Sequence, residues 1–178
     1  MVSKSAFATA FALALLPAAA PAAPVPPVFA PVAFLLGDWT GSGTSDAGAG
    51  KGGDTFRLDL QDNVVVRRSH SEYPGKDGKP GVVYDALMVI YKEPAHAELR
   101  ADYFDNGHVI HYSLAAGSEP NVARFVSDAH PGEPVFRLTY GGAADGKTLE
   151  VKFEIEPPGA PAFSTLADGV ERRAPAKL

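Results

Sequence analysis

Short alternating segments between regularly spaced turn signals are the feature that most restricts how this chain can fold. Glycine, proline, asparagine and aspartate gather at 61–63, 74–81, 92–95, 105–107, 117–121, 130–134, 141–146 and 157–161. Asn106 and Gly107 match a type I′ hairpin turn, in which both central residues have positive φ. Between the turns lie about ten candidate strands of about six to eleven residues, rich in valine and aromatic residues. Their expected first residues are Asp38, Asp54, Asn63, Gly81, Ala95, Gly107, Asn121, Pro134, Lys147 and Phe163.

Alternation within these segments indicates half-buried strands with a solvent side. In 147–156, for example, Leu149, Val151 and Phe153 share one face of a strand and charged residues share the other. Successive antiparallel hairpins in this number favour closure, because a closed sheet has no exposed edge strand. The sequence therefore predicts an all-β fold. We expect a closed antiparallel meander β-barrel of about ten strands, with a short helical turn ending at Gly37 before the first strand.

Residues 1–22 have the pattern of a secretory signal peptide. One lysine precedes an apolar run of about a dozen residues, and Ala20-Pro21-Ala22 fits the small-residue cleavage rule. The run is too short to span ~30 Å of hydrocarbon, so no stable membrane anchor is expected after signal removal. We therefore predict a periplasmic or secreted protein. It would comprise an extended Pro/Ala-rich lead-in at 23–33, a lipocalin-like β-barrel domain at 34–174 and a tail at 175–178.

Charge and cysteine content exclude several classes of function. The chain of 178 residues has a formal net charge of −5 and no basic run longer than a pair, so nucleic-acid binding is not expected. The chain has no cysteine, which excludes disulfides, thiolate metal sites and a cysteine nucleophile. An exported chain of this kind has to be held together by packing alone.

Three segments, 64–73, 82–91 and 108–116, carry polar residues on both faces. Each unpaired buried polar group costs ~1–3 kcal/mol, so this mixed polarity predicts either a break in strand register or a partly polar pocket in the lumen. Tyrosine hydroxyls inside an apolar barrel would suit a ligand with one polar end, although the same tyrosines also fit a plain aromatic core. The candidate ligand-binding residues are Arg68, His70, Tyr84, Tyr103, His111, Tyr112 and Tyr140.

The single tryptophan, in the stretch FLLGDWTGSGTS at 34–45, has an expected structural role. Trp39 would fill the open end of a meander barrel, and Gly37 would let the preceding turn cross that opening. Closure of the barrel brings the last strand beside the first. Arg172 or Arg173 should therefore lie over the indole, where a cation–π contact contributes ~0.5–2 kcal/mol.

This combination of a short turn, G-x-W on the first strand and an arginine on the last strand resembles the calycin superfamily, which includes lipocalins and fatty-acid-binding proteins. GDWTGSGT at 37–44 and YFDNGHVIHY at 103–112 are similar to the nitrobindin-like, ten-stranded branch and its exported relatives. The resemblance covers 34–173 and implies an internal cavity for a small, largely apolar molecule. In the nitrobindin branch that molecule is haem, held by a histidine in the C-terminal part of the barrel. Haem is not expected here, because no histidine follows His130.

The sequence contains no motif that assigns a catalytic residue or a metal ligand. The glycine-rich segment 41–54 departs from a phosphate-binding loop and is expected to be a flexible loop at the barrel mouth. A metal held by His70, Glu72 and either His108 or His111 is an alternative, and no nucleophile motif is present. Binding of a small apolar or amphipathic molecule in the lumen is the main hypothesis. An isomerase or hydrolase with His70 or His111 as base, and a cell-envelope interaction module with a filled barrel, stay open.

Overall fold

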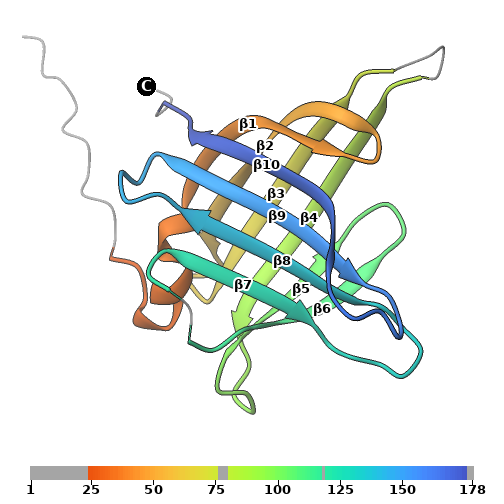
Figure 1. Ribbon diagram of the computed structural model, residues 1–178. Coiled ribbons are helices and arrows are strands. Elements are labelled where there is room, and N and C mark those ends of the chain that lie inside the picture. The colour runs from red at the N-terminus through yellow and green to blue at the C-terminus, as the bar shows by residue number, and fades with distance from the viewer. Residues whose placement is uncertain (1–23, 76–79, 118, 176–178) are drawn as a thin grey trace, which may run out of the picture.

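The computed structural model describes residues 24–75, 80–117 and 119–175, and the expected signal peptide at 1–22 lies outside them. Within the described residues, ten antiparallel strands form one closed sheet in the order β1-β10-β9-β8-β7-β6-β5-β4-β3-β2 (Figure 1). The predicted closed meander barrel is confirmed, and it is compatible with a calycin-like layout. In this part of the chain, no helix has the length and apolar character needed to cross a membrane.

The strand boundaries agree closely with the sequence prediction except at two places. The strands are β1 (Gly37–Ser45), β2 (Gly48–Asp59), β3 (Val64–Tyr73), β4 (Val82–Lys92), β5 (Leu99–Phe104), β6 (Val109–Leu114), β7 (Val122–Ser127), β8 (Val135–Gly142), β9 (Thr148–Glu156) and β10 (Ser164–Arg173). β2 begins at Gly48 instead of Asp54, and β5 begins at Leu99 instead of Ala95.

The prediction of a flexible loop over 41–54 is wrong, because this segment is a long β-hairpin. β1 and β2 pair in continuous register from Ser45 opposite Gly48 toward the start of β1. The strands bend so sharply here that a β-carbon at Gly41 would overlap the backbone carbonyl of Val170 in β10. Glycine is a poor strand former by propensity, yet only glycine permits an approach this close.

A 3-10 helix, η1 (Pro27–Leu35), packs at the end of the barrel where β1 begins (Figure 1). The sequence predicts an extended lead-in at 23–33 with only one helical turn after it, whereas the structure is helical from Pro27 to Leu35. Phe29, Val32 and Leu35 are spaced by the three-residue period of a 3-10 helix and are fully buried. Pro27 stands in the first turn, where proline is tolerated, whereas Pro31 lies inside the helix. Burial of the apolar face therefore stabilises the helix in spite of Pro31.

Trp39 seals the same end of the barrel. Its side chain is buried, and Nε1 donates a hydrogen bond of 2.7 Å to the carbonyl of Leu35 in η1. Arg173 lies directly opposite Trp39 in the β1–β10 register and packs over the indole. Arg172 points to the other face of β10 and donates to the hydroxyl of Thr148 at 3.3 Å. The arginine that closes the barrel on the tryptophan is therefore Arg173.

Aromatic side chains fill the lumen above Trp39. The ring of Tyr140 makes edge-to-face contacts with Phe56, at 5.5 Å between centroids, and with Phe125, at 6.4 Å. All three side chains are fully buried. Edge-to-face pairs of this kind stabilise a core by ~0.5–1.5 kcal/mol beyond the area that they bury.

The turn between β5 and β6 is present, but the prediction of a type I′ conformation is wrong. Neither Asn106 nor Gly107 is among the residues with positive φ in the described structure. Asp105 organises this turn, because its Oδ1 accepts a hydrogen bond of 3.0 Å from the backbone N–H of His108. An aspartate side chain that bonds to the backbone of the turn replaces the conformation expected from Asn-Gly alone.

Candidate functional site

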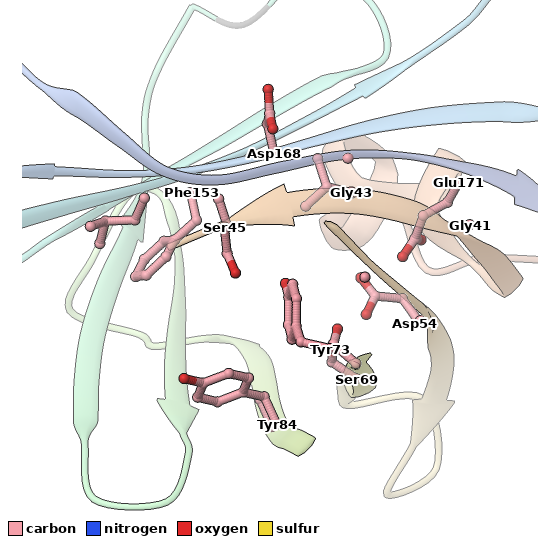
Figure 2. A pocket seen from close by; sticks show the side chains of 18 of the residues that line it. Gly41, Gly43, Ser45, Asp54, Ser69, Tyr73, Tyr84, Phe153, Asp168 and Glu171 are labelled. Carbon is pink, nitrogen blue, oxygen red and sulfur yellow. The ribbon is translucent and has the colours of Figure 1, made fainter. Parts of the chain in front are cut away.

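A pocket of about 350 Å³ lies in the lumen and extends from Asp54 to the β1–β2 turn at Asp46 and Ala47; Figure 2 shows side chains that line it. Its lining comes mainly from β1, β2, β3 and β10, with side chains from β4, β5, β8 and β9. Known small-molecule pockets have volumes of about 300–1,000 Å³, so this one lies at the lower end of that range.

Glycine residues in adjacent strands keep this part of the lumen open. The glycines that line the pocket are Gly41, Gly43, Gly50, Gly52 and Gly169. Gly43 lies opposite Gly50 in β2 and opposite Gly169 in β10, so the wall is formed by backbone across three neighbouring strands. The hairpin whose glycines permit tight strand bending therefore also supplies the free volume of the pocket.

A buried ion pair forms the bottom of the pocket. Arg67 of β3 donates from Nε to Oδ2 of Asp54 in β2 at 2.8 Å, and their side chains are 8% and 1% exposed. Asp54 lies opposite Trp39 in the β1–β2 register, which places the pair next to the sealed end. A charge at this depth requires a partner, because removal of one member of a buried pair costs ~3–5 kcal/mol.

Glu171 of β10 adds a second carboxyl group to the bottom of the pocket. Figure 2 shows the carboxyl groups of Asp54 and Glu171 directed toward one another. Burial, together with the negative charge of Asp54, raises the pKa of Glu171 to about 8. Within the described residues, Oδ1 of Asp54 and Oε2 of Glu171 are buried and have no hydrogen-bond partner. The pocket therefore contains two carboxyl groups that each have one buried oxygen atom without a hydrogen-bond partner in this part of the chain.

Tyrosine side chains lie around the ion pair. The ring centroid of Tyr140 is 5.7 Å from Cζ of Arg67, and Tyr103 and Tyr112 make an edge-to-face contact at 6.4 Å. Burial raises the pKa of the Tyr112 and Tyr140 hydroxyls above their ordinary value. Both hydroxyls are buried without a hydrogen-bond partner among the described residues. They remain neutral and can donate or accept a hydrogen bond.

The upper part of the pocket is more apolar. Its wall includes the side chains of Leu138, Val151, Phe153 and Leu166. At the mouth, Tyr73 of β3 and Tyr84 of β4 make an edge-to-face contact at 5.8 Å. Ser45, Ser69, Ser71 and Asp105 also line the pocket, so its walls present apolar side chains on one part and hydroxyl and carboxyl groups on another.

The structure places part of the predicted ligand-binding set in the lumen and part on the outer wall. Tyr84 and Tyr103 line the pocket, and Tyr112 and Tyr140 are inward-facing and buried. The residues exposed on the outer wall are Arg68, His70 and His111. Strand alternation is the reason, because the inward positions of β3 are those of Arg67 and of every second residue after it.

The outward histidines have carboxylate neighbours on the barrel surface. His70 lies 2.7 Å from Asp85 through Nδ1, and Nδ1 of His111 lies 2.7 Å from Asp102. Bonds to Asp85 and to Glu72 raise the pKa of His70. These contacts belong to the outer face of the sheet and do not reach the pocket.

Sequence reasoning missed the three charged residues at the bottom of the pocket, although a signal existed for each. Side chains two residues apart in a strand face the same side. Asp54 therefore faces the same side as the buried Phe56, and Glu171 faces the same side as Arg173. Arg67 faces the same side as the buried Val65, but three consecutive valines precede it, so no alternation of apolar and polar residues is visible there. Mixed polarity predicted polar lumen residues in β3, β4 and β6. The structure shows them in β3, where Arg67 faces inward, whereas Asp85 in β4 and His111 in β6 face outward.

Metal or haem ligation by histidine in the lumen does not fit this arrangement. All five histidines of the sequence are exposed, so none faces the pocket. Among residues 24–75, 80–117 and 119–175, no group of three or more His, Asp or Glu side chains is arranged to hold a metal ion. Nε2 of His70 lies 3.2 Å from Oε1 of Glu72 on the outer wall of the barrel. This position does not allow the alternative metal site, in which His70 and Glu72 would bind a metal across the lumen.

No protein-family model and no curated protein matches the chain.

Proposed function

We propose that this barrel binds a small amphipathic molecule in its lumen. One observation carries the proposal. Asp54 and Glu171 each have a buried oxygen atom without a hydrogen-bond partner among the described residues, and both residues line an open pocket walled by glycines. Buried polar atoms without partners are rare, and each costs ~1–3 kcal/mol. A ligand that supplies the missing hydrogen bonds would recover that free energy. The calycin-like layout is in keeping with this proposal.

The volume of the pocket supports a ligand larger than water. A water molecule occupies about 30 Å³ of the liquid, so a pocket of about 350 Å³ exceeds what a single ordered water would fill. The apolar side chains of Val151 and Phe153 would contact the hydrocarbon part of a ligand, and the carboxyl groups would contact its polar end. A barrel filled solid, the interaction-module alternative, does not match this open volume.

The enzyme alternative gains no support from the site. It required His70 or His111 as a base in the lumen, and both side chains are exposed on the outer wall. Two buried carboxyl groups beside an open volume can bind a ligand without a catalytic step. Binding is therefore the function that the geometry supports best.

A matched pair of tryptophan substitutions tests the proposal. Ala86 of β4 lines the pocket, so A86W would fill it; Val170 is 47% exposed on the outer face of β10, so V170W would not. We expect N-phenyl-1-naphthylamine, a neutral dye that fluoresces in apolar surroundings, to bind wild type and V170W and to lose at least about tenfold in affinity for A86W. Thermal melts would confirm that both variants are folded. Equal binding to all three proteins would contradict the proposal.

The proposed place of action is the periplasm or the extracellular space, on the basis of the signal-peptide pattern at 1–22. N-terminal sequencing of the protein from the cell envelope or the medium tests this point. A mature chain that begins at Ala23 is expected, and an intact N-terminus on protein in the cytoplasm would contradict it.

A further inference from the structure

We propose that the ligand carries a protonated amine, held between the carboxyl groups of Asp54 and Glu171, and that Glu171 gives up its proton when the amine binds. This inference rests on the proposed lumen-binding function and specifies the chemistry of the ligand. It follows from three features of the pocket: the carboxyl oxygen atoms that have no hydrogen-bond partner among the described residues, the net charge of the residues at its bottom, and the position of its apolar side chains.

Asp54 is oriented to accept one more hydrogen bond. Its side chain is 1% exposed, and Oδ2 is already bonded to Nε of Arg67. Oδ1 is buried and has no partner within the described residues, while Asp54 itself lines the pocket. An ionised carboxylate only accepts hydrogen bonds, so the group that completes it has to be a donor. Neutral Glu171 can supply that donor in the free protein, and an ammonium group would replace it once Glu171 is ionised.

Glu171 supplies a second acceptor when it is ionised. Its carboxyl group faces that of Asp54, and its Oε2 is likewise buried and unpartnered in the described part of the chain (Figure 2). Two facing carboxyl groups in a poorly solvated site disfavour simultaneous ionisation, because like charges repel and neither is hydrated. The raised pKa of Glu171 has this cause, with burial as the larger contribution. A cation placed between them would offset the repulsion and supply hydrogen bonds in place of the missing hydration.

The sum of charges at the bottom of the pocket favours a cation over an anion. Asp54 and Arg67 cancel one another, so ionised Glu171 leaves one net negative charge among these three residues. A bound ammonium group brings that sum to zero, whereas a bound carboxylate would add a second negative charge beside two carboxyl groups. Isolated charges in a desolvated site are costly, so the ammonium is the preferred head group.

The proton balance of this step is simple. At pH 7 the free protein holds Glu171 mainly as the neutral acid, since its pKa is raised to about 8. The amine enters as the ammonium form, the carboxyl O–H bond of Glu171 breaks, and the proton passes to the buffer. No covalent bond to the ligand forms, and the ammonium donates to Asp54 and Glu171.

Three phenyl compounds of similar size separate the possible head groups: 2-phenylethylamine, 2-phenylethanol and 3-phenylpropanoate. Each is used to displace N-phenyl-1-naphthylamine from the wild-type lumen at pH 7. The amine should bind at least about tenfold more tightly than the alcohol, and the carboxylate should bind most weakly. Equal displacement by amine and alcohol, tighter binding of the carboxylate, or no displacement by the amine would each overturn the inference. The binding of the dye to wild type, and the loss of that binding in A86W, test the lumen function separately and do not depend on these results.

The role of Glu171 is tested by proton release. Calorimetric titration of the amine in phosphate and in Tris at pH 7 should show close to one proton released per bound amine in wild type, which is the fraction expected for a group of pKa about 8. E171Q should release no proton and lose most of its preference for the amine over the alcohol. E150Q is the matched control, because Glu150 is exposed on the outer face of β9. Proton release by E171Q equal to that of wild type would overturn the assignment.

Discussion

The guanidinium of Arg173 lies over the indole of Trp39, with Cζ 4.2 Å from the ring centroid. The same group donates from Nη1 to the carbonyl of Leu36 at 2.7 Å and from Nε to the carbonyl of Gly146 at 2.8 Å. One side chain on the last strand thus joins the first strand, the segment after η1 and the β8–β9 turn. This contact closes the barrel below the bottom of the pocket, because Trp39 lies opposite the pocket residue Asp54, and the pocket therefore opens only at the other end.

Removal of the Arg173 side chain should destabilise the protein. R173A loses a cation–π contact and hydrogen bonds to backbone carbonyls, so we expect the free energy of unfolding to fall by ~1–3 kcal/mol. R172A is the control and should change stability little, because Arg172 is exposed and its side-chain hydrogen bond to Thr148 is long, at 3.3 Å. Urea unfolding measures both. Equal losses for the two variants would show that the contact with Trp39 does not stabilise the barrel.

Gly37 is required by the same junction. Its φ is +133°, which residues other than glycine rarely adopt, and a β-carbon there would overlap Nη1 of Arg173. G37A should therefore lower the free energy of unfolding by ~1–3 kcal/mol. The double variant G37A/R173A separates the two causes in a thermal or urea melt. If the overlap with Arg173 is the main cause, the double variant will lose less than the sum of the single losses.

The buried ion pair should matter much more for stability than an exposed one. R67Q leaves Asp54 charged and unpaired at the bottom of the pocket, and we expect a loss of ~3–5 kcal/mol. R57Q removes the partner of Asp38 in a largely exposed pair and should cost ~0–1 kcal/mol. Urea unfolding of the two variants at the same pH gives the comparison. Similar, small losses would mean that water reaches the Asp54–Arg67 pair.

Stability should depend on pH through Glu171. Its folded pKa of about 8 lies above the ordinary value of 4.5, so the native state holds a proton that the unfolded state has released between these pH values. The stabilisation is full below about pH 4.5 and is lost as the pH rises to about 8. The loss should amount to a few kcal/mol, since one pKa unit corresponds to about 1.4 kcal/mol.

The comparison with E171Q isolates this contribution. Between pH 4.5 and pH 8, the difference in unfolding free energy between E150Q and E171Q should change steadily, because only E150Q keeps the titrating group. Chemical denaturation at a series of pH values measures it. A difference that is independent of pH would mean that the pKa of Glu171 is ordinary and that its carboxyl group is hydrated.

Local sequence patterns are sufficient to predict most of this fold. Alternation in 147–156 identifies β9 and its inward face, because a strand with one buried side repeats every two residues. The extent of the β1–β2 hairpin is not predictable in this way, because its glycine-rich part shows no alternation. Its glycines carry no side chains that alternate, and their role becomes visible only when β10 approaches Gly41 as the barrel closes.

The site is harder to predict than the fold, because it depends on which residues of distant strands share one level of the barrel. Arg67 and Arg68 are neighbours in sequence, and a register shift of one residue exchanges which of them faces the lumen. Asp54 and Glu171 are far apart along the chain and meet only because β1, which pairs with both β2 and β10, lies between their strands. The tyrosines were easier to find, since large aromatic residues on strands commonly face a core.

A crystal structure of the wild-type protein grown with 2-phenylethylamine tests the central claim most directly. We expect the amine in the lumen, with its nitrogen about 2.7–2.9 Å from Oδ1 of Asp54 and from Oε2 of Glu171, and its ring against Val151 and Phe153. An amine bound only on the outer wall, or a lumen that holds water alone at a saturating amine concentration, would contradict it.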